Sequence, residues 1–413
     1  MPSPIWAERG YEHDETEAWQ QLKRYVAQSQ DTAPMSIYLH IPFCEQRCGF
    51  CDCYSIPLGK NRAKKDEKYT RALISEIDAW SEIRSIGQRP VTTIHFGGGT
   101  PYCLRNDLFE VIINHCKNCF NITAETELAI ESTGALIADY HLSHLLQLGF
   151  NRLHIGVQTL EEPLRGIIGR KVTTSMLINR LINAIKKGFI TSVDVIYGLP
   201  GQTVKSLLKT LESLVDAGLH GISLYRLNIS RRNHGFLKQF KDIKRDALYE
   251  YVLYQIADQF LMYSGYQKNH FVHFARPEDR NYYSTHLQRG EDLLGLGASA
   301  DGVFGNYHYR HPGCAKYMKE KESGRPAFEG GVAENEEEQK YGPAVAALMC
   351  GGISLQDLQH INANDLLGKW LDCGLLRKTP DPLQFTLSAN GSWLINDMIL
   401  ELRTKAEDSN IPR

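Results

Sequence analysis

The sequence predicts an α/β fold with a parallel sheet, open or curled into a barrel, followed by a small, mainly helical C-terminal domain. Between residues 36 and 230, short β-type runs alternate six times with segments of helical apolar spacing. Glycines close several of the helical segments, as helix C-termini prefer. Because alternating strands and helices are typical of βα units, the strands are expected to run parallel.

The predicted elements can be placed in order along this region. The strands are expected at 36–41, 91–97, 127–132, 152–159, 192–198 and 221–228. The helices between them are expected at 69–86, 104–116, 136–148, 176–187 and 204–217, three of them ending at Gly149, Gly188 and Gly218. In parallel sheets and barrels, chemistry gathers where the strands end. The unusual loops of this chain follow these strands, so we expect the active site there.

The βα rhythm also suggests a division of the chain. We expect an N-terminal extension over 1–35, a core over 36–230, a core extension with the substrate cavity over 231–328, and a small domain over 335–413. The third part looks helix-rich up to residue 286 and then returns as one glycine-punctuated strand, "DLLGLGASADGVFGNYHY". An acidic stretch, "EGGVAENEEEQKYG", leads into the last part.

Composition narrows the class of protein. The 413 residues are 42% hydrophobic with a net charge of −2, which is typical of a globular protein and gives no support to nucleic acid as a partner. No signal peptide or bilayer-spanning apolar run is visible, so a cytoplasmic location without a transmembrane segment is expected. In a reducing compartment the ten cysteines favour metal binding or redox chemistry over disulfides.

The densest cysteine cluster follows the first predicted strand. Cys44, Cys48 and Cys51 form C-x3-C-x2-C, and Cys53 lies just beyond. Thiolate sulfur suits iron-sulfur clusters or zinc, and three protein ligands would leave one iron of a cubane open to bind a small molecule. The single residue between Cys51 and Cys53 makes joint ligation of one cubane awkward. Structural zinc and incidental buried thiols are the alternatives.

This loop resembles the radical S-adenosylmethionine (radical SAM) superfamily. The stretches "YLHIPFC", "HFGGGTP", "GFNRLHIGVQT", "DVIYGLPGQT" and "HFARPEDRN" look like the branch containing oxygen-independent coproporphyrinogen III oxidases, related haem chaperones, anaerobic haem-degrading enzymes and class C radical methyltransferases. The resemblance implies a partial (β/α)6 barrel and a 4Fe-4S cluster held by Cys44, Cys48 and Cys51. It also implies that SAM chelates the open iron and is cleaved to a 5′-deoxyadenosyl radical.

The resemblance also implies roles for individual residues. It places six of them around SAM: Gly98, Gly99, Glu131, Gln158, Arg170 and Asp194. Tyr38 and Cys53 become candidate catalytic residues, Tyr38 because its family counterpart lies near the cluster, with core packing as an equally fair alternative for both. At the position of Cys53 the oxidases show cysteine and the chaperones usually an aromatic residue. Cys116 and Cys119, in a second C-x2-C, are interpreted as free thiols.

The function expected first is methylation of an sp2 carbon, with menaquinone as substrate and two SAM molecules. The stretch "YYSTHLQRGED" stands where the oxidases carry a Gln-Gly-Tyr-Thr-Thr element, which puts porphyrinogen decarboxylation in doubt. The alternatives are a tetrapyrrole enzyme, either opening haem or oxidising coproporphyrinogen III, and a haem chaperone without catalysis. The expected partners are an apolar quinone or tetrapyrrole and a low-potential electron donor such as flavodoxin or ferredoxin, and peripheral membrane contact stays open.

Overall fold

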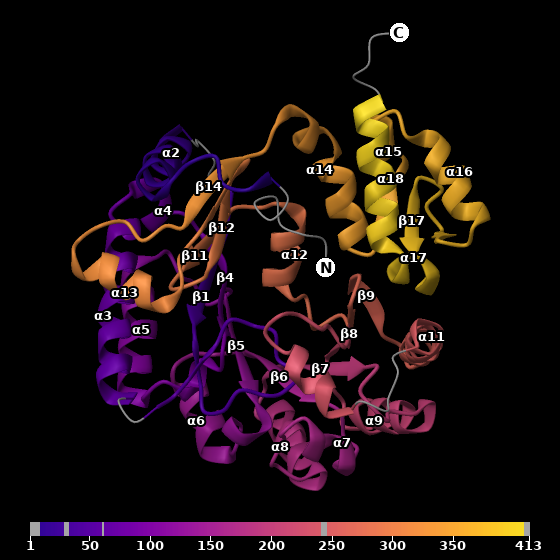
Figure 1. The fold of residues 1–413 in the computed structure, drawn as a ribbon, viewed down its shortest axis with the longest axis horizontal. Helices are drawn as coiled ribbons and strands as arrows, with labels where there is room; N and C mark the ends of the chain where they lie inside the picture. Colours follow the sequence, from indigo (N-terminus) through magenta and orange to yellow (C-terminus); the bar gives the residue numbers. More distant parts are fainter. Residues whose placement is uncertain (1–8, 29–32, 60–61, 241–245, 409–413) are drawn as a thin grey trace.

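The computed structural model describes residues 9–28, 33–59, 62–240 and 246–408, and a curved sheet of twelve strands lies at its centre (Figure 1). Seven neighbouring strands run parallel. They are, in chain order, β1 (Met35–Ile41), β4 (Val91–Gly98), β5 (Glu127–Thr133), β6 (Arg152–Gln158), β7 (Ile190–Tyr197), β8 (Gly221–Arg226) and β11 (Leu293–Leu296). The first six confirm the predicted strands, and the seventh pairs with β1. Within the described ranges the two sheet edges do not pair, so the barrel is partial.

The predicted helices cover the outer side of this sheet (Figure 1). They are α3 (Arg62–Ser81), α5 (Asn106–Cys119), α6 (Asp139–Gln147), α8 (Thr174–Lys186) and α9 (Val204–Asp216), with the short α7 (Glu162–Ile167) between β6 and α8. The three predicted glycine ends have φ of +83°, +94° and +80°, the left-handed conformation of a helix C-terminus.

One helix differs from its prediction. The helix expected at 69–86 begins at Arg62 and ends at Ser81. The prediction missed its first turns because they are polar and carry no apolar periodicity. Ile83 is extended, with φ −77° and ψ 107°, and starts the separate short helix α4 (Arg84–Gly87). This break turns Ile86 into the core, where 1% of it is exposed.

The described part of the N-terminal region belongs to the core. Helix α2 (Glu15–Gln28) buries Ala18, Leu22 and Val26, each at most 1% exposed. The Trp19 ring meets Trp80 of α3 edge to face, with centroids 5.2 Å apart. Residues 9–28 therefore brace the sheet from outside.

Antiparallel strands extend the sheet on both sides. Beyond β11 lie β12 (Asp301–Phe304), β13 (Tyr307–Arg310) and β14 (Gly330–Ala333), and beyond β8 lie β10 (His273–Ala275) and β9 (Gln267–His270). The single strand expected after residue 290 is thus three strands. Gly297 and Gly305, with φ of +92° and +58°, sit at the two turns between them.

Four further helices complete this part of the chain. They are α10 (His234–Leu237), α11 (Ala247–Tyr263), α12 (Tyr282–Arg289) and α13 (Cys314–Glu322), with single 3-10 turns at Pro101–Cys103, Gly134–Leu136 and Lys238–Phe240. Helix α12 contacts β1 and β4 and lies at the open middle of the barrel in Figure 1. It therefore brings residues distant in sequence to the barrel interior.

The C-terminal part forms a second hydrophobic core. It contains α14 (Glu336–Met349), α15 (Leu355–Gln359), α16 (Asn364–Asp372), α17 (Ala389–Trp393) and α18 (Ile395–Asp408), with a small sheet of β15 (Gly352–Ser354), β17 (Gln384–Leu387) and β16 (Leu376–Lys378). Trp370 is fully buried there, and Phe271 joins this core from the turn after β9. The region is mainly helical, as predicted, with a sheet that the sequence did not indicate. In the part of the chain described, no helix combines the length and apolarity needed to cross a bilayer.

Candidate active site

The cysteine loop leaves the barrel at the carboxyl end of β1. Two short parallel strands, β2 (Phe43–Cys44) and β3 (Ile56–Pro57), close its base. Within the loop the Cys51 N–H donates to the Cys48 carbonyl over 3.1 Å. The Asn233 side-chain amide donates to the Phe50 carbonyl over 2.6 Å, so the segment after β8 fastens the tip. These contacts hold the three thiols of the motif in one loop.

The four thiols have different environments. Burial raises the pKa of Cys44, partly offset by a 3.4 Å hydrogen bond with the Thr100 hydroxyl. A hydrogen bond from Cys53 lowers the pKa of Cys51 to about 6, and the same bond raises the pKa of Cys53 well above its usual value. Cys51 therefore favours the thiolate form that binds metal, whereas Cys53 keeps its proton. Cys44, Cys48 and Cys51 remain the proposed cluster ligands, with Cys53 beside them in the loop.

The glycine turn after β4 packs against this loop. Gly98 has φ +110°, and a Cβ atom on it would lie 2.7 Å from the His40 ring. A Cβ on Gly99 would lie 2.5 Å from the Phe43 carbonyl oxygen. Because neither position has room for a side chain, the backbone of the turn packs directly against the base of the cysteine loop, and the Gly99 and Thr100 N–H groups donate to the Ile41 and Phe43 carbonyls at 2.9 and 2.8 Å.

Glu131 connects this turn to the barrel interior. Its two oxygens accept hydrogen bonds from His95 Nε2 at 3.0 Å and from the Gly98 N–H at 3.3 Å. Burial raises the pKa of Glu131, but the contacts with His95 and Gly98 lower it by more, so the net shift of the pKa is downward. An ionised carboxylate therefore lies at the carboxyl end of β5, where it can receive an ammonium or hydroxyl group.

Gln158 and Arg170 meet at the end of β6. Gln158 adopts φ +70°, which is unusual for a residue with a side chain, and its buried Oε1 has no partner among the described residues. A Cβ added to Gly156 would lie 2.9 Å from Gln158 Nε2 and 3.1 Å from an Arg170 nitrogen. Arg170 Nε also lacks a partner in the described ranges, and its guanidinium lies 5.6 Å from the Phe50 ring. Two unsatisfied polar groups thus lie at the end of β6, one of them beside Phe50 of the cysteine loop, and such groups are expected where a ligand binds.

Asp194 lies in the same interior layer but is already paired. Its Oδ1 accepts a 2.5 Å hydrogen bond from His154 Nε2, and His154 Nδ1 contacts the Ser192 hydroxyl at 2.7 Å. Burial lowers the pKa of His154, but Asp194 raises it more, so this histidine is held in its charged form. The sequence analysis did not single out His154. The sequence did carry a signal for His154. It lies two residues before Gly156 on the same strand, so both positions are on the face of β6 that points into the barrel.

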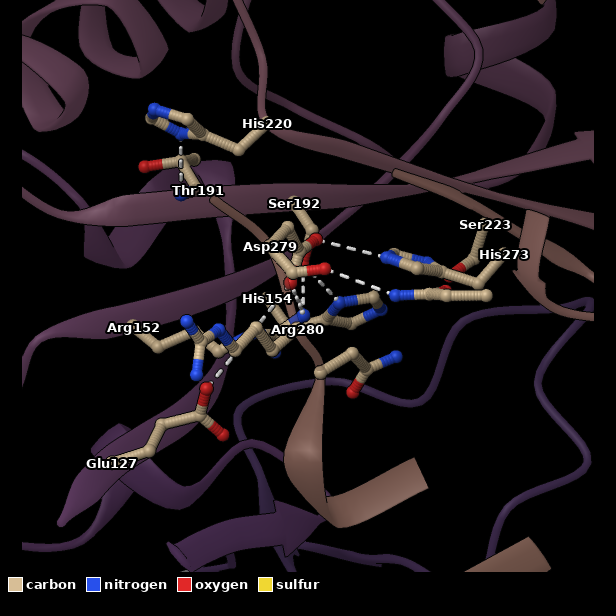
Figure 2. Close-up of polar contacts among 12 residues, drawn as sticks. Glu127, Arg152, His154, Thr191, Ser192, His220, Ser223, His273, Asp279 and Arg280 are labelled. Atoms are coloured by element: carbon tan, nitrogen blue, oxygen red, sulfur yellow. Dashed lines mark hydrogen bonds and ion pairs between the residues drawn. The ribbon is translucent and has the colours of Figure 1, made fainter. Parts of the chain in front are cut away.

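Below this pair a buried ionic network crosses the barrel (Figure 2). Asp279, from the "HFARPEDRN" motif, accepts hydrogen bonds from Arg152 at 2.9 and 3.1 Å and from His273 at 2.8 Å. His273 Nδ1 in turn accepts from the Ser223 hydroxyl at 2.7 Å. Because Arg152, His273 and Asp279 are each 1% exposed, this motif organises the barrel floor and does not line a cavity.

Tyr38 belongs to an aromatic stack on the inner wall. Its ring lies parallel to that of Tyr283 on α12, with centroids 5.1 Å apart, and Tyr283 stacks on His95 at 4.3 Å. The Tyr38 hydroxyl donates to His40 Nδ1 over 3.2 Å, and His40 Nε2 donates to the Tyr54 carbonyl over 3.3 Å. Tyr38 therefore links the barrel wall with the base of the cysteine loop, but it also packs, as the alternative interpretation proposed.

Comparisons with known proteins agree with this geometry. Residues 38–214 match the radical SAM superfamily profile. The chain is 29% identical over 338 residues to the oxygen-independent coproporphyrinogen III oxidase of Escherichia coli (strain K12), covering 77% of this chain and 72% of that protein. It is 26% identical over 269 residues to the haem chaperone HemW of Buchnera aphidicola subsp. Acyrthosiphon pisum (strain APS), covering 65% of this chain and 70% of that protein. The crystal structure of coproporphyrinogen III oxidase (HemN) from Escherichia coli superposes with a TM-score of 0.80 at 26% identity, covering 95% of each chain.

These comparisons correct the function expected first. The relatives that match most of this chain are coproporphyrinogen oxidases and haem chaperones, so menaquinone methylation is wrong as the main interpretation. The methyltransferase expectation rested on motifs that the whole branch shares, on a similar chain length, and on the absence of oxidase features, among them the Gln-Gly-Tyr-Thr-Thr element. Shared motifs identify the radical chemistry and leave the substrate open.

The residues present fit the cofactors that the fold implies. Three thiols in one loop, one of them with a lowered pKa, suit three irons of a cubane. The unpartnered atoms of Gln158 and Arg170 and the close glycine turn suit SAM beside them. Residues 38–214 therefore form a radical SAM domain, the chain as a whole is similar to the oxygen-independent coproporphyrinogen III oxidases, and its cofactors are a 4Fe-4S cluster and SAM.

Proposed function

We propose that this chain is a radical SAM enzyme that acts on a tetrapyrrole. The observation that carries the proposal is the similarity to the Escherichia coli coproporphyrinogen III oxidase over 95% of both chains. This likeness extends beyond the shared barrel into α12 and the C-terminal part. Regions outside the radical SAM core are where relatives that share one chemistry differ in substrate, so similarity there supports a shared substrate class.

Two features of the candidate site support a tetrapyrrole. The partly exposed rings of Tyr38 and Tyr283, stacked with the buried ring of His95, form an aromatic cluster on the inner wall of the barrel. Two exposed arginines lie around the cysteine loop. The Arg47 side chain donates to the Arg232 carbonyl over 2.9 Å, and the Arg232 side chain donates to the Asp52 carbonyl over 3.1 Å. Arginine recognises carboxylates, and tetrapyrroles of this kind carry propionate side chains.

Each residue of the site has a role in the proposal. Cys44, Cys48 and Cys51 would hold the cluster, which would supply the electron for reductive cleavage of bound SAM and so allow hydrogen abstraction from the substrate. Glu131, Gln158 and Arg170 orient SAM through its polar groups, and His154 holds Asp194 beside them. Cys53, the thiol that keeps its proton, is placed to exchange hydrogen with a substrate radical.

The test is an anaerobic assay with purified, cluster-loaded protein, SAM, and either coproporphyrinogen III or haem. We expect 5′-deoxyadenosine to form in a substrate-dependent manner, together with a tetrapyrrole of changed mass, and neither to form with Cys48→Ala. Loss of carbon dioxide from coproporphyrinogen would identify oxidation, and a linear pigment from haem would identify ring opening. The ratio of 5′-deoxyadenosine to product counts the SAM molecules used, for which two are expected. Comparing flavodoxin, ferredoxin and dithionite as reductants tests the proposed electron donor.

A haem chaperone is the second candidate, because HemW is also a relative. It predicts haem bound in the same assay with no substrate-dependent cleavage of SAM. Cys53 favours the enzyme, since the oxidases carry cysteine at this position. Product formation would exclude a purely chaperone role, and haem binding without any turnover would replace the enzymatic proposal.

A further inference from the structure

Three metal-ligating side chains meet on the outer face of the barrel, away from the candidate active site. Asp78 lies on α3, and His115 and Cys119 lie one turn apart on α5, which packs beside α3 (Figure 1). Their ligand atoms all lie within 4.8 Å of one another, the sole such group of three found among the described residues. His115 Nε2 is 2.7 Å from Asp78 Oδ1 and 3.6 Å from Cys119 Sγ.

The arrangement differs from a catalytic relay. In a Cys-His-Asp relay the thiol and the carboxylate contact opposite nitrogens of the imidazole, so that a proton can pass through the ring. Here both Asp78 and Cys119 approach the same nitrogen, Nε2. The three donor atoms lie within 4.8 Å of one another, close enough to be ligands of one metal ion.

The nitrogen-to-sulfur distance agrees with a tetrahedral ion, whereas the nitrogen-to-oxygen distance is shorter than an ion would set. With zinc bonds of about 2.0–2.1 Å to nitrogen and about 2.3 Å to sulfur, the nitrogen and sulfur ligands should be roughly 3.6 Å apart. The separation between His115 Nε2 and Cys119 Sγ is 3.6 Å. The nitrogen and oxygen ligands should be roughly 3.3 Å apart. His115 Nε2 and Asp78 Oδ1 are closer, at 2.7 Å, because a proton holds them together without an ion, and the half-exposed carboxylate has room to move outward.

The neighbouring cysteine does not belong to the group. Cys116 is fully buried in the core, and burial raises the pKa of its thiol well above the usual value. The C-x2-C pair therefore points in two directions, and the pairing that matters is Cys119 with His115, four residues apart on one helix face.

We propose that Asp78, His115 and Cys119 form a zinc site on the outside of the barrel, with water as the fourth ligand. Imidazole, thiolate and carboxylate together suit zinc better than magnesium or calcium, which prefer oxygen ligands alone. Binding displaces the proton shared by Asp78 and His115 and the thiol proton of Cys119. The site joins α3 and α5, and it changes the interpretation of Cys119 as a free thiol.

The test is equilibrium dialysis of the cluster-loaded, full-length protein against micromolar Zn²⁺ under anaerobic conditions, with zinc and iron counted per chain. We expect one zinc per chain in the wild type, and at least a tenfold weaker affinity in His115→Ala and in Cys119→Ser. The control is His144→Ala, because His144 makes a similar 2.8 Å contact with Glu110 from α5 but has no thiol beside it. This control should retain zinc, and iron should be unchanged in all variants.

A second measurement identifies the ligand atoms. Co²⁺ added to the full chain carrying Cys44→Ala, Cys48→Ala and Cys51→Ala should give thiolate-to-cobalt charge-transfer absorption that Cys119→Ser removes. The proposal is overturned if the wild type binds no zinc, if His115→Ala and Cys119→Ser bind it as well as the wild type, or if bound cobalt shows no Cys119-dependent band.

Discussion

Replacing Asp279 with alanine perturbs the buried ionic network on the barrel floor. Asp279 accepts three hydrogen bonds, two from Arg152 and one from His273 (Figure 2). Burial raises the pKa of Asp279, but Arg152 and His273 lower it much more, so the carboxylate is ionised in the folded protein. The variant removes that charge and leaves its partners in place.

The expected loss follows from what remains buried. Arg152 is 1% exposed, and after the substitution its nearest carboxylate is Glu127, at 3.7 Å. Removing one partner of a buried ion pair typically costs about 3–5 kcal/mol, and the longer contact with Glu127 compensates the buried charge of Arg152 only in part. We therefore expect Asp279→Ala to lower the free energy of unfolding by about 3–5 kcal/mol.

The assay is urea denaturation followed by tryptophan fluorescence, with the iron content of all samples matched. The matched control is Asp365→Ala, which breaks the 2.7 Å pair with Lys405 on the surface, where the two side chains are 60% and 37% exposed. An exposed pair contributes at most about 1 kcal/mol. Adding Arg152→Met to Asp279→Ala should cost less than the sum of the two single changes. If Asp279→Ala loses no more than Asp365→Ala, the reasoning about the buried charge is refuted.

Three further predictions concern the site itself. Cys48→Ala should abolish the cluster absorbance and SAM cleavage, whereas Cys53→Ala should retain the cluster; equal loss of iron in both would contradict the three-ligand assignment. Gly98→Ala would place a Cβ 2.7 Å from the His40 ring at φ +110°, so equilibrium dialysis should show SAM affinity at least tenfold weaker, and unchanged affinity would argue against the turn as part of the SAM site. Burial lowers the pKa of His40 from 6.5 to about 4. As the pH falls, this histidine is therefore protonated in the unfolded chain before it is protonated in the folded protein. Wild-type stability should therefore fall by about 2 kcal/mol between pH 7 and pH 5 through this group, a loss that urea denaturation should not find in His40→Gln.

The sequence alone predicted the elements whose signal is local. The six strands carry apolar residues on both faces, because helices cover one side and the barrel interior lies on the other, and such runs stand out between helical segments. Helix α12 was missed, since "YYSTHLQR" is polar and short and has no apolar stripe. Its place is decided by packing, through the stacking of Tyr283 on Tyr38 and His95.

Some residues of the candidate site could likewise be predicted from local sequence patterns, and others could not. The cysteine loop and the glycine turn could be identified from spacing, because their ligand atoms come from a few consecutive residues. The pairing of Asp194 with His154, forty residues earlier, depends on the register of β6 beside β7, which no local pattern specifies. The substrate class could not be predicted either, since the motifs are shared by relatives with different substrates, and comparison over most of the chain was needed to overturn the methyltransferase expectation.

The sequence by itself therefore determined the parallel α/β core and pointed to the radical SAM chemistry, because these depend on short-range spacing and on the order of strands and helices, and it led to the proposal of Cys44, Cys48 and Cys51 as cluster ligands. The tertiary structure decided which distant side chains meet. In the folded protein Asp194 contacts His154, and Asp279 lies between Arg152 and His273. Asp78 likewise lies beside His115 and Cys119. The physical reason is that strand register and helix packing set these contacts, and both depend on the whole core being assembled at once.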